Sequence, residues 1–353
     1  MSFYSSIIRP LMFRLPAETA HDLGIRALRL GRFVREEDGA PFGPLERFGL
    51  TFKNPIGMAA GFDKNALVVD QLCSLGFGFV EVGTVTFKAQ AGNPKPRLFR
   101  LPADRALINR LGFNNDGAAA IAERLKSLER RCIVGVNIGK NKDVPIAAAS
   151  EDYLRVLNVV HRVADYIAVN VSSPNTANLR DLQVRARLEE LLSALVKRNT
   201  ELGAKPLLLK IAPDLSEQEI ESIVGICTDL RLSGMIATNT TVSRSGLNTQ
   251  DIKSFGEGGI SGAPLTHRSR DVIAAIRRHS KGKLPIIGVG GIMTPEAAFA
   301  KIAAGACLLQ TYTGFVYGGP SFARELNKGL LTIIRKRGFT SLDEAVGSSE
   351  NGR

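Results

Sequence analysis

From residue 55 onward, short apolar segments alternate with amphipathic ones, and this alternation restricts the possible folds more than any other feature of the chain. The short segments are apolar throughout, which is typical of parallel strands buried on both faces. Eight such strands, most of them followed by a helix-like segment, favour an α/β fold of the parallel (β/α)8 or TIM-barrel type, with a doubly wound sheet as the alternative. The expected strands are residues 56–61, 79–85, 133–138, 166–171, 207–211, 235–239, 286–289 and 308–312, and the expected helices include 118–131, 182–199, 216–230, 269–279 and 295–304.

Three of these strands carry an asparagine at or near their carboxyl end: Asn137, Asn170 and Asn239. Burying an amide is costly unless something hydrogen-bonds to it. The carboxyl ends of barrel strands meet at one face, where barrel enzymes hold their active sites. Two long connections, residues 86–117 and 241–263, also follow carboxyl ends, and loops of this length are usually binding loops or lids. The sequence therefore predicts a ligand site at this face.

The N-terminal segment, residues 1–40, lies outside the barrel pattern. It contains two apolar stripes at helical spacing, and residues 1–35 hold six arginines against two acids. Pro10 and Pro16 are expected to break the segment into short pieces. A basic amphipathic pair of helices is typical of an interfacial membrane anchor, and a helical cap on the barrel is the alternative. We thus expect an extension over 1–40, a barrel over 41–340 and a polar, frayed tail over 341–353.

The amino-acid composition limits the functions that the protein could have. The hydrophobic content of 44% and the charged content of 23% are ordinary for a globular protein, with no apolar run long enough to span a membrane and no signal-peptide pattern. We therefore expect the protein to stay in the compartment where it is made. The net charge of +12 favours anionic surfaces, but no long run of like charges supports nucleic-acid binding. The four cysteines are far apart and are expected to be buried, reduced thiols: Cys73, Cys132, Cys227 and Cys307.

The strand ends contain amides, hydroxyls and lysines rather than histidines or carboxylate clusters. Three histidines fall in helical segments and His21 lies in the extension, so neither a metal site nor a Ser-His-Asp triad is expected. Lys64 and Lys140 follow strands, and Lys210 lies within one. A lysine surrounded by apolar residues requires an anionic partner, and snorkelling from a strand edge is the alternative.

Glycines after the last strands indicate a phosphate site. The seventh strand leads into Gly290 and Gly291, the eighth into Thr313 and Gly314, and a glycine-rich stretch spans 258–262. In barrels the loops after strands seven and eight commonly bind phosphate through backbone N–H groups. No GxGxxG opens a helix after the first strand, which disfavours a dinucleotide fold.

Ser173 is the candidate catalytic base. It stands three residues beyond Asn170, on a turn fixed by Pro174, and would have to be desolvated and pass its proton to Thr176 or to water. A serine before a proline is alone only a turn signal, but here it lies between two asparagines at a strand end.

Together these segments resemble the dihydroorotate dehydrogenases of the membrane-associated, quinone-reducing class (class 2). The resemblance extends over nearly the whole chain. The matching segments are NPIGMAAGFDK (54–64), EVGTVT (81–86), GNPKPRLFRL (92–101), INRLGFNN (108–115), NVSSPNT (170–176), LLLKI (207–211), ATNTT (237–241), GVGGI (288–292) and YTG (312–314).

The resemblance implies one FMN per chain and a dihydroorotate site beside it. Ser173 would take a proton from C5 of the substrate as hydride leaves C6 for the flavin, whose reduced form a charged lysine would stabilise. The FMN-binding residues would be Ala60, Gly61, Lys64, Thr84, Asn137, Asn170, Lys210 and Thr238, with Gly262, Gly291, Tyr312 and Thr313 at the phosphate. The residues that bind dihydroorotate would be Lys64, Asn109, Arg110, Leu111, Gly112, Phe113, Asn170, Asn175, Asn239 and Thr240.

The resemblance also implies a quinone as final electron acceptor, because the soluble classes have cysteine where this chain has Ser173. His21, Arg100 and Tyr312 would line a quinone tunnel under the N-terminal helices. The expected protein is a peripheral, monomeric enzyme of pyrimidine biosynthesis on the cytoplasmic face of the cell membrane, and a ping-pong flavoprotein. Two alternatives stay open: another FMN-dependent barrel oxidoreductase, and a non-redox phosphate-binding barrel such as an isomerase or lyase.

Overall fold

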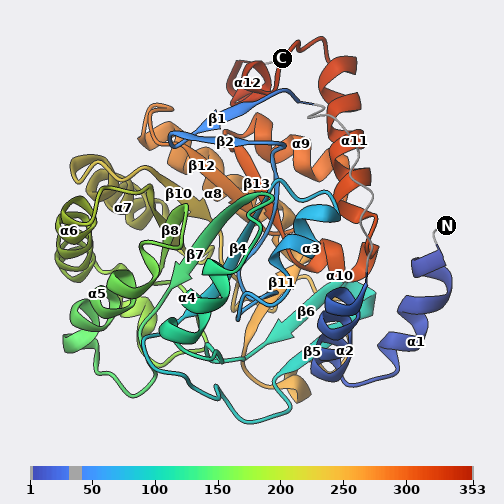
Figure 1. Cartoon of the computed structure of the whole chain (residues 1–353). Helices are drawn as coiled ribbons and strands as arrows, with labels where there is room; N and C mark the ends of the chain where they lie inside the picture. Colours follow the sequence, from blue (N-terminus) through green and yellow to red (C-terminus); the bar gives the residue numbers. More distant parts are fainter. Residues whose placement is uncertain (1–2, 32–41, 352–353) are drawn as a thin grey trace.

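The structure, a computed structural model, describes residues 3–31 and 42–351. Eight parallel strands close into a barrel in the order β10-β12-β13-β3-β4-β7-β8-β9, and helices surround it (Figure 1). The predicted TIM barrel is confirmed, and the observed strands overlap all eight expected ones. The strands are β3 (Ile56–Met58), β4 (Phe79–Val85), β7 (Ile133–Ile138), β8 (Tyr166–Asn170), β9 (Leu207–Ile211), β10 (Gly234–Ala237), β12 (Ile286–Val289) and β13 (Leu308–Thr311).

Helices follow the strands and cover the barrel from outside. Local signals fix some of their starts: Ser216 and Glu219 form a capping box at α7, and Thr294 caps α9 just before Pro295. The helices are α3 (Val69–Ser74), α4 (Ala118–Lys126), α5 (Ala149–Val160), α6 (Arg185–Glu201), α7 (Glu217–Asp229), α8 (Thr266–His279), α9 (Pro295–Ala303), α10 (Thr313–Gly318) and α11 (Phe322–Lys336).

Large rings fill the amino-terminal end of the barrel because glycines face them. A Cβ at Gly57 would lie 2.4 Å from the Phe79 ring, and one at Gly135 would lie 2.0 Å from the Tyr166 ring. The hairpin of β1 (Leu45–Arg47) and β2 (Leu50–Phe52) covers this end, with Phe52 packed edge-on against Phe79. Side chains alternate along a strand, so positions two residues further on point into the next layer of the barrel, towards its carboxyl end.

The two long connections are not plain loops. They contain β5 (Leu98–Leu101), β6 (Ala106–Asn109) and β11 (Gly259–Gly262), which pair into an antiparallel sheet in the order β11-β6-β5. Gly259 of this sheet lies beside the Thr240 side chain, just beyond β10, so the sheet stands at the carboxyl end of the barrel. Residues 86–117 and 241–263 therefore build one wall above the strand ends.

The N-terminal segment forms helices beside this wall (Figure 1). A π-helical turn, η1 (Tyr4–Ile8), runs directly into α1 (Arg9–Phe13), and α2 (Ala17–Leu30) follows. Pro10 does not break the first piece, contrary to expectation, because it occupies the first turn of α1, where its missing N–H is not needed. Pro16 does separate α1 from α2. The predicted end of the extension, residues 32–40, lies outside the described residues.

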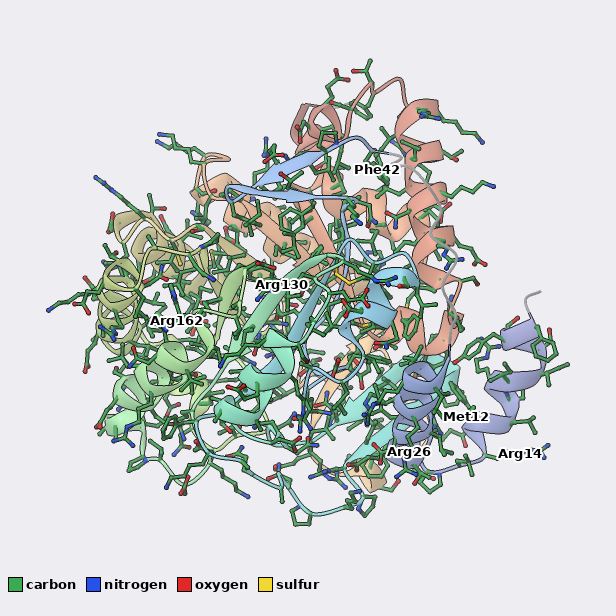
Figure 2. All side chains as sticks on the ribbon, in the orientation of Figure 1. Met12, Arg14, Arg26, Phe42, Arg130 and Arg162 are labelled. Atoms are coloured by element: carbon green, nitrogen blue, oxygen red, sulfur yellow. A yellow bond between two sulfur atoms is a disulfide. The ribbon has the colours of Figure 1, made fainter. Side chains whose placement is uncertain are left out.

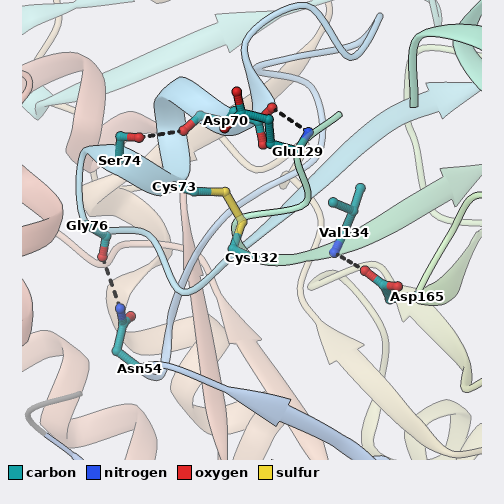
Figure 3. The surroundings of a disulfide bond; sticks show 9 residues. All are labelled: Asn54, Asp70, Cys73, Ser74, Gly76, Glu129, Cys132, Val134 and Asp165. Atoms are coloured by element: carbon teal, nitrogen blue, oxygen red, sulfur yellow. Dashed lines mark hydrogen bonds between the residues drawn. A yellow bond between two sulfur atoms is a disulfide. The ribbon is translucent and has the colours of Figure 1, made fainter. Parts of the chain in front are cut away.

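Two predictions about the periphery are corrected. Cys227 and Cys307 are buried free thiols as expected, but Cys73 and Cys132 are only half-buried and form a disulfide with a Cα–Cα distance of 5.9 Å (Figure 3). Strand β4 pairs with β7, which brings Cys132, just before β7, beside the helix α3 that packs on β4. Residues 342–345 form a short helix, α12 (Leu342–Ala345), whose end residues are buried, so this part of the tail is packed rather than frayed.

None of the helices in the described ranges is long and apolar enough to cross a membrane.

Candidate active site

A cavity of about 1040 Å³ opens at the carboxyl ends of the barrel strands, under the wall formed by β5, β6 and β11. The strand ends, the wall and the loop that follows β3 all contribute to its lining. The predicted site residues that line it are Ala60, Gly61, Lys64, Thr84, Asn109, Leu111, Gly112, Phe113, Asn170, Ser173, Asn175, Lys210, Thr238, Asn239, Thr240, Gly262, Gly291, Tyr312 and Thr313. Segments from both halves of the chain thus meet as the sequence predicted.

The charged side chains in the lining are cationic. It contains two lysines, Lys64 and Lys210, and no aspartate, glutamate, histidine or cysteine among the described residues. Its other polar groups are amides and hydroxyls, which can donate and accept hydrogen bonds. The cavity therefore suits an anionic, hydrogen-bonding ligand, and within the described chain no group of three or more histidines, cysteines or carboxylates could hold a metal ion.

Lys210 has the anionic partner that its burial requires. Its Nζ lies 3.2 Å from Oε1 of Glu81, and both side chains are almost fully buried. The same carboxylate accepts hydrogen bonds from Asn137 Nδ2 at 2.8 Å, Gln310 Nε2 at 2.7 Å and the Tyr166 hydroxyl at 3.1 Å. These three donors and the lysine satisfy the buried carboxylate, and the carboxylate in turn holds the lysine at the cavity floor.

The strand-end amides form a continuous network. Asn170 Nδ2 donates to Thr84 Oγ1 at 2.9 Å and to Asn137 Oδ1 at 3.2 Å, while Asn239 Nδ2 donates to Asn170 Oδ1 at 3.2 Å. Asn239 Nδ2 also donates to Ser172 Oγ at 3.0 Å. Asn137 continues this network to Glu81, so its amide lies one layer below the cavity and does not line it. The network fixes the orientations of the Asn170 and Asn239 amides, both of which face the cavity.

Ser173 lies in the cavity wall with 5% of its surface exposed. Its Oγ accepts a hydrogen bond from the Asn175 backbone N–H at 3.2 Å, which fixes the turn. Asn175 Nδ2 in turn donates to Asn109 Oδ1 at 2.9 Å, and this bond ties the turn to the wall above. Burial desolvates the hydroxyl, and these hydrogen bonds hold it at a defined place. A serine base requires both.

Two of the predicted glycines pack closely against the backbone of other segments. A Cβ at Gly291 would lie 2.4 Å from the backbone of Thr266, the first residue of α8, and one at Gly262 would lie 2.4 Å from the Arg105 carbonyl oxygen. Both glycines have positive φ angles, +69° and +100°, so a side chain is excluded on two grounds. Thr313 Oγ1 donates to Ser261 Oγ at 2.9 Å and joins the start of α10 to β11.

A second cavity of about 860 Å³ lies between α2 and the barrel. His21, Lys64 and Tyr312 line it, and the latter two also line the first cavity, so these side chains separate the two spaces. Burial lowers the pKa of His21 to about 3, so this ring is neutral at physiological pH. Burial also lowers the pKa of Lys64 to about 8, while Glu18 acts to raise it.

Two predicted site residues have structural contacts instead. Arg110 lies over the Phe99 ring at 4.7 Å and donates to the Glu257 carbonyl at 3.0 Å, outside the cavity lining. Arg100 lines neither cavity; it donates to the Leu15 carbonyl at 2.8 Å and lies over the Phe13 ring at 4.6 Å, thereby holding the junction of α1 and α2.

Sequence reasoning missed Glu81 and Gln310. Both stand in mostly apolar strands, and a carboxylate at such a position signals a buried cation elsewhere in the barrel. The matching signal was Lys210, which is the only charged residue in the sequence of its own strand.

Comparison with known proteins agrees with this geometry. The family model described as dihydroorotate dehydrogenase matches residues 45–334. A dihydroorotate dehydrogenase (quinone) of Roseiflexus sp. (strain RS-1) is 50% identical over 98% of this chain and 99% of its own length. One of Gloeobacter violaceus is 49% identical over 97% of this chain and 98% of its own.

Solved structures agree as well. The ligand-free enzyme of this family from Eimeria tenella superposes with a TM-score of 0.89 at 38% identity, covering 94% of this chain and 99% of that one. The same enzyme in complex with ferulenol gives the same TM-score and identity, covering 95% of that chain. The family match, the near-complete coverage and the shared barrel place this chain in the dihydroorotate dehydrogenase family.

Proposed function

We propose that this chain oxidises (S)-dihydroorotate to orotate in pyrimidine biosynthesis, with FMN as the immediate hydride acceptor and a membrane quinone as the final one. The observation that carries the proposal is the desolvated Ser173 in a cavity lined by two lysines, a set of amides and no carboxylate among the described side chains. The relatives' name, dihydroorotate dehydrogenase (quinone), supplies the substrate and the acceptor class.

The cavity chemistry suits this substrate. Dihydroorotate carries a carboxylate and a ring with both imide donors and acceptors. Lys64 would meet the carboxylate, and the amides of Asn109, Asn170, Asn175 and Asn239 would meet the ring. Thr240 and the segment 111–113 complete the lining on the wall side. The fixed amide network preorganises these groups, so little ordering is required when the substrate binds.

Ser173 would act as the base that removes the proton from C5. Because a serine hydroxyl is a weak base, its proton must pass on as it accepts the new one. Thr176 is buried on the same turn, three residues further along, and is the neighbour through which the proton would leave.

FMN fits the rest of the cavity. Small residues such as Ala60, Gly61 and Gly290 form a thin wall that leaves room for a planar ring, and the lining carries positive charge for an anionic cofactor. Gly262, Gly291, Tyr312 and Thr313 would hold the phosphate; Thr84, Lys210 and Thr238 would contact the ring system. When bound there, FMN supplies the two-electron acceptor that the reaction needs.

The second cavity would take the quinone. It lies between α2 and the barrel, with Tyr312 and Lys64 shared between the two spaces. His21 and Phe62 line it and pack edge-on at 5.1 Å, so the quinone ring would meet these two rings in a space whose lining also carries charged side chains, among them Glu18 and Arg26. Arg100 would support this space indirectly through the α1–α2 junction.

The N-terminal segment would hold the enzyme on the cytoplasmic face of the membrane as a peripheral monomer. Of the nine large hydrophobic side chains exposed in the described residues, seven lie in this segment, from Phe3 to Leu30. Exposed arginines accompany them: Figure 2 shows Arg14 at the edge of the molecule, and Arg26 is exposed on α2. Such a mixture suits an interface with anionic lipid headgroups.

The visible spectrum of the purified protein, recorded before and after anaerobic addition of L-dihydroorotate, tests the proposal. Flavin bands that bleach support both cofactor and substrate. Persistent bands in FMN-saturated protein would favour a flavin-dependent oxidoreductase for another small acid. A colourless protein that cannot be reconstituted with FMN would favour a non-redox, phosphate-binding barrel.

A further inference from the structure

The segment that carries Ser173 is fastened by an arginine whose role the proposed function does not explain. Arg180 lies in η4 (Leu179–Gln183), between β8 and α6, and lines neither cavity. Its Nε donates to the Ser172 carbonyl at 3.2 Å, beside Ser173. Its Nη2 donates to the Thr240 carbonyl at 3.0 Å, beyond β10.

A third contact anchors the guanidinium. Nη1 of Arg180 lies 2.9 Å from Oδ2 of Asp214, in the loop that follows β9. The Asp214 carboxylate also accepts hydrogen bonds from the Thr241 hydroxyl and, at 3.2 Å, from the Val242 backbone N–H. One arginine thus joins the ends of three strands, β8, β9 and β10.

Arg180 fixes the positions of its acceptors rather than supplying a large electrostatic stabilisation. The side chains of Arg180 and Asp214 are each 24% exposed, and ion pairs with access to solvent contribute little free energy by themselves. What the guanidinium provides is a planar set of donors that reaches three acceptors at fixed angles. A lysine could pair with Asp214 but could not span both carbonyls.

We propose that Arg180 is a positioning residue that sets the place of Ser173 relative to the substrate-facing Thr240. The inference rests on the proposed role of Ser173 as the base. The rest of the segment is held by other contacts: Leu179 and Leu182 are buried, and Gln183 Oε1 accepts from the Ala212 backbone N–H at 3.1 Å. Loss of Arg180 would therefore shift the serine turn without unfolding the segment.

The test uses the full-length, FMN-saturated enzyme and anaerobic stopped-flow reduction by L-dihydroorotate. The variants are Arg180→Met, Arg180→Lys and Asp214→Asn. The matched control is Arg185→Met, because Arg185 is exposed at the start of α6 and its ion pair with Glu189 is as long as 4.0 Å. The limiting rate and the dissociation constant of dihydroorotate are measured separately, since a displaced base lowers the first more than it weakens the second.

We expect Arg180→Met to lower the limiting rate by about tenfold to hundredfold, the cost of misplacing a reacting group by roughly 1 Å. Arg180→Lys and Asp214→Asn should fall between this variant and the wild type, and Arg185→Met should match the wild type. In a Ser173→Ala background, Arg180→Met should add almost no further loss, because Arg180 acts through the serine.

Failure of the positioning role can be distinguished from failure of the proposed function. A wild-type enzyme whose flavin dihydroorotate does not bleach would refute the proposed function itself. If the wild type is bleached, wild-type rates in both Arg180→Met and Arg180→Lys would refute the positioning role. An equally large loss from Arg180→Met in the Ser173→Ala background would also refute it, because Arg180 would then act independently of the serine. If Arg180→Met does not retain flavin, Arg180→Lys and Asp214→Asn take its place. Their rates are then compared with the wild type and with the same substitutions in the Ser173→Ala background.

Discussion

Replacing Glu81 by glutamine removes a buried negative charge and preserves the shape of the side chain beside Lys210. Glu81 is fully buried, and its Oε1 lies 3.2 Å from Lys210 Nζ. Breaking a buried ion pair by neutralising one partner typically costs about 3–5 kcal/mol, because the remaining charge stays desolvated. We expect a loss near the lower limit, because the glutamine oxygen would still accept from Lys210 and Asn137.

The nitrogen of the introduced glutamine amide also has a hydrogen-bond partner. Gln310 Oε1 is buried without a hydrogen-bond partner in the described structure, so a flipped Gln310 amide could accept from the nitrogen of the introduced glutamine. The Tyr166 hydroxyl, which donates to Oε2 of Glu81, would then donate to the flipped Gln310 oxygen, since the Gln310 amide lies 3.2 Å from it. The substitution therefore removes the charge while an acceptor stays within reach of each donor. We predict that Glu81→Gln lowers the free energy of unfolding by about 3 kcal/mol.

Urea denaturation of the FMN-saturated protein, followed by circular dichroism and flavin fluorescence, measures this loss. Glu189→Gln is the matched control, since Glu189 is exposed on α6 and should change stability by less than about 0.5 kcal/mol. In Glu81→Gln/Lys210→Met no buried charge is left over, so the double variant should be more stable than Glu81→Gln alone. A Glu81→Gln protein as stable as the control would refute the idea that the buried carboxylate holds Lys210.

Three further predictions concern binding, the disulfide and the extension. Lys64 is protonated below its pKa of about 8 and neutral above it, so the affinity of the free enzyme for dihydroorotate should fall as pH rises through 8. Lys64→Met should bind weakly at every pH and lose this dependence, as titration of flavin bleaching would show. Cys73→Ala opens a loop with a sequence separation of 59, which should lower stability by up to about 4 kcal/mol in denaturant titrations; stability unchanged by the substitution or by a reductant would contradict this. Deleting residues 1–40 should abolish quinone turnover but leave anaerobic flavin reduction intact, whereas loss of bound flavin would favour a structural cap.

The barrel could be predicted because its signal is local and repeated. Each buried strand is a short apolar run, most are followed by an amphipathic helix, and strand-end polar residues such as Asn170 and Ser173 must then meet at one face. The small sheet of β5, β6 and β11 could not be predicted in this way. Its strands are too short for a clear alternation, and β11 pairs with β6, which lies far earlier in the chain.

Contacts between residues far apart in the chain could also not be predicted from the sequence. The predicted barrel already placed β4 beside β7, but the disulfide also depends on how α3 packs on β4, next to the residues that lead into β7. Glu81 and Lys210 were each visible as a charge in an apolar strand, but their contact depends on the barrel bringing inward positions of β4 and β9 together. Arg110 and Arg100 were expected in ligand sites because of their segments' resemblance, yet their side chains turn towards backbone carbonyls and aromatic rings.

The rate of anaerobic flavin reduction by dihydroorotate in Ser173→Ala tests the central claim most directly. The substitution removes one hydroxyl from a turn held by its neighbours, so FMN and orotate should still bind. We predict that the limiting rate falls by about a hundredfold or more, the contribution usual for a positioned general base. A variant that binds both ligands and is reduced as fast as the wild type would remove Ser173 from the mechanism.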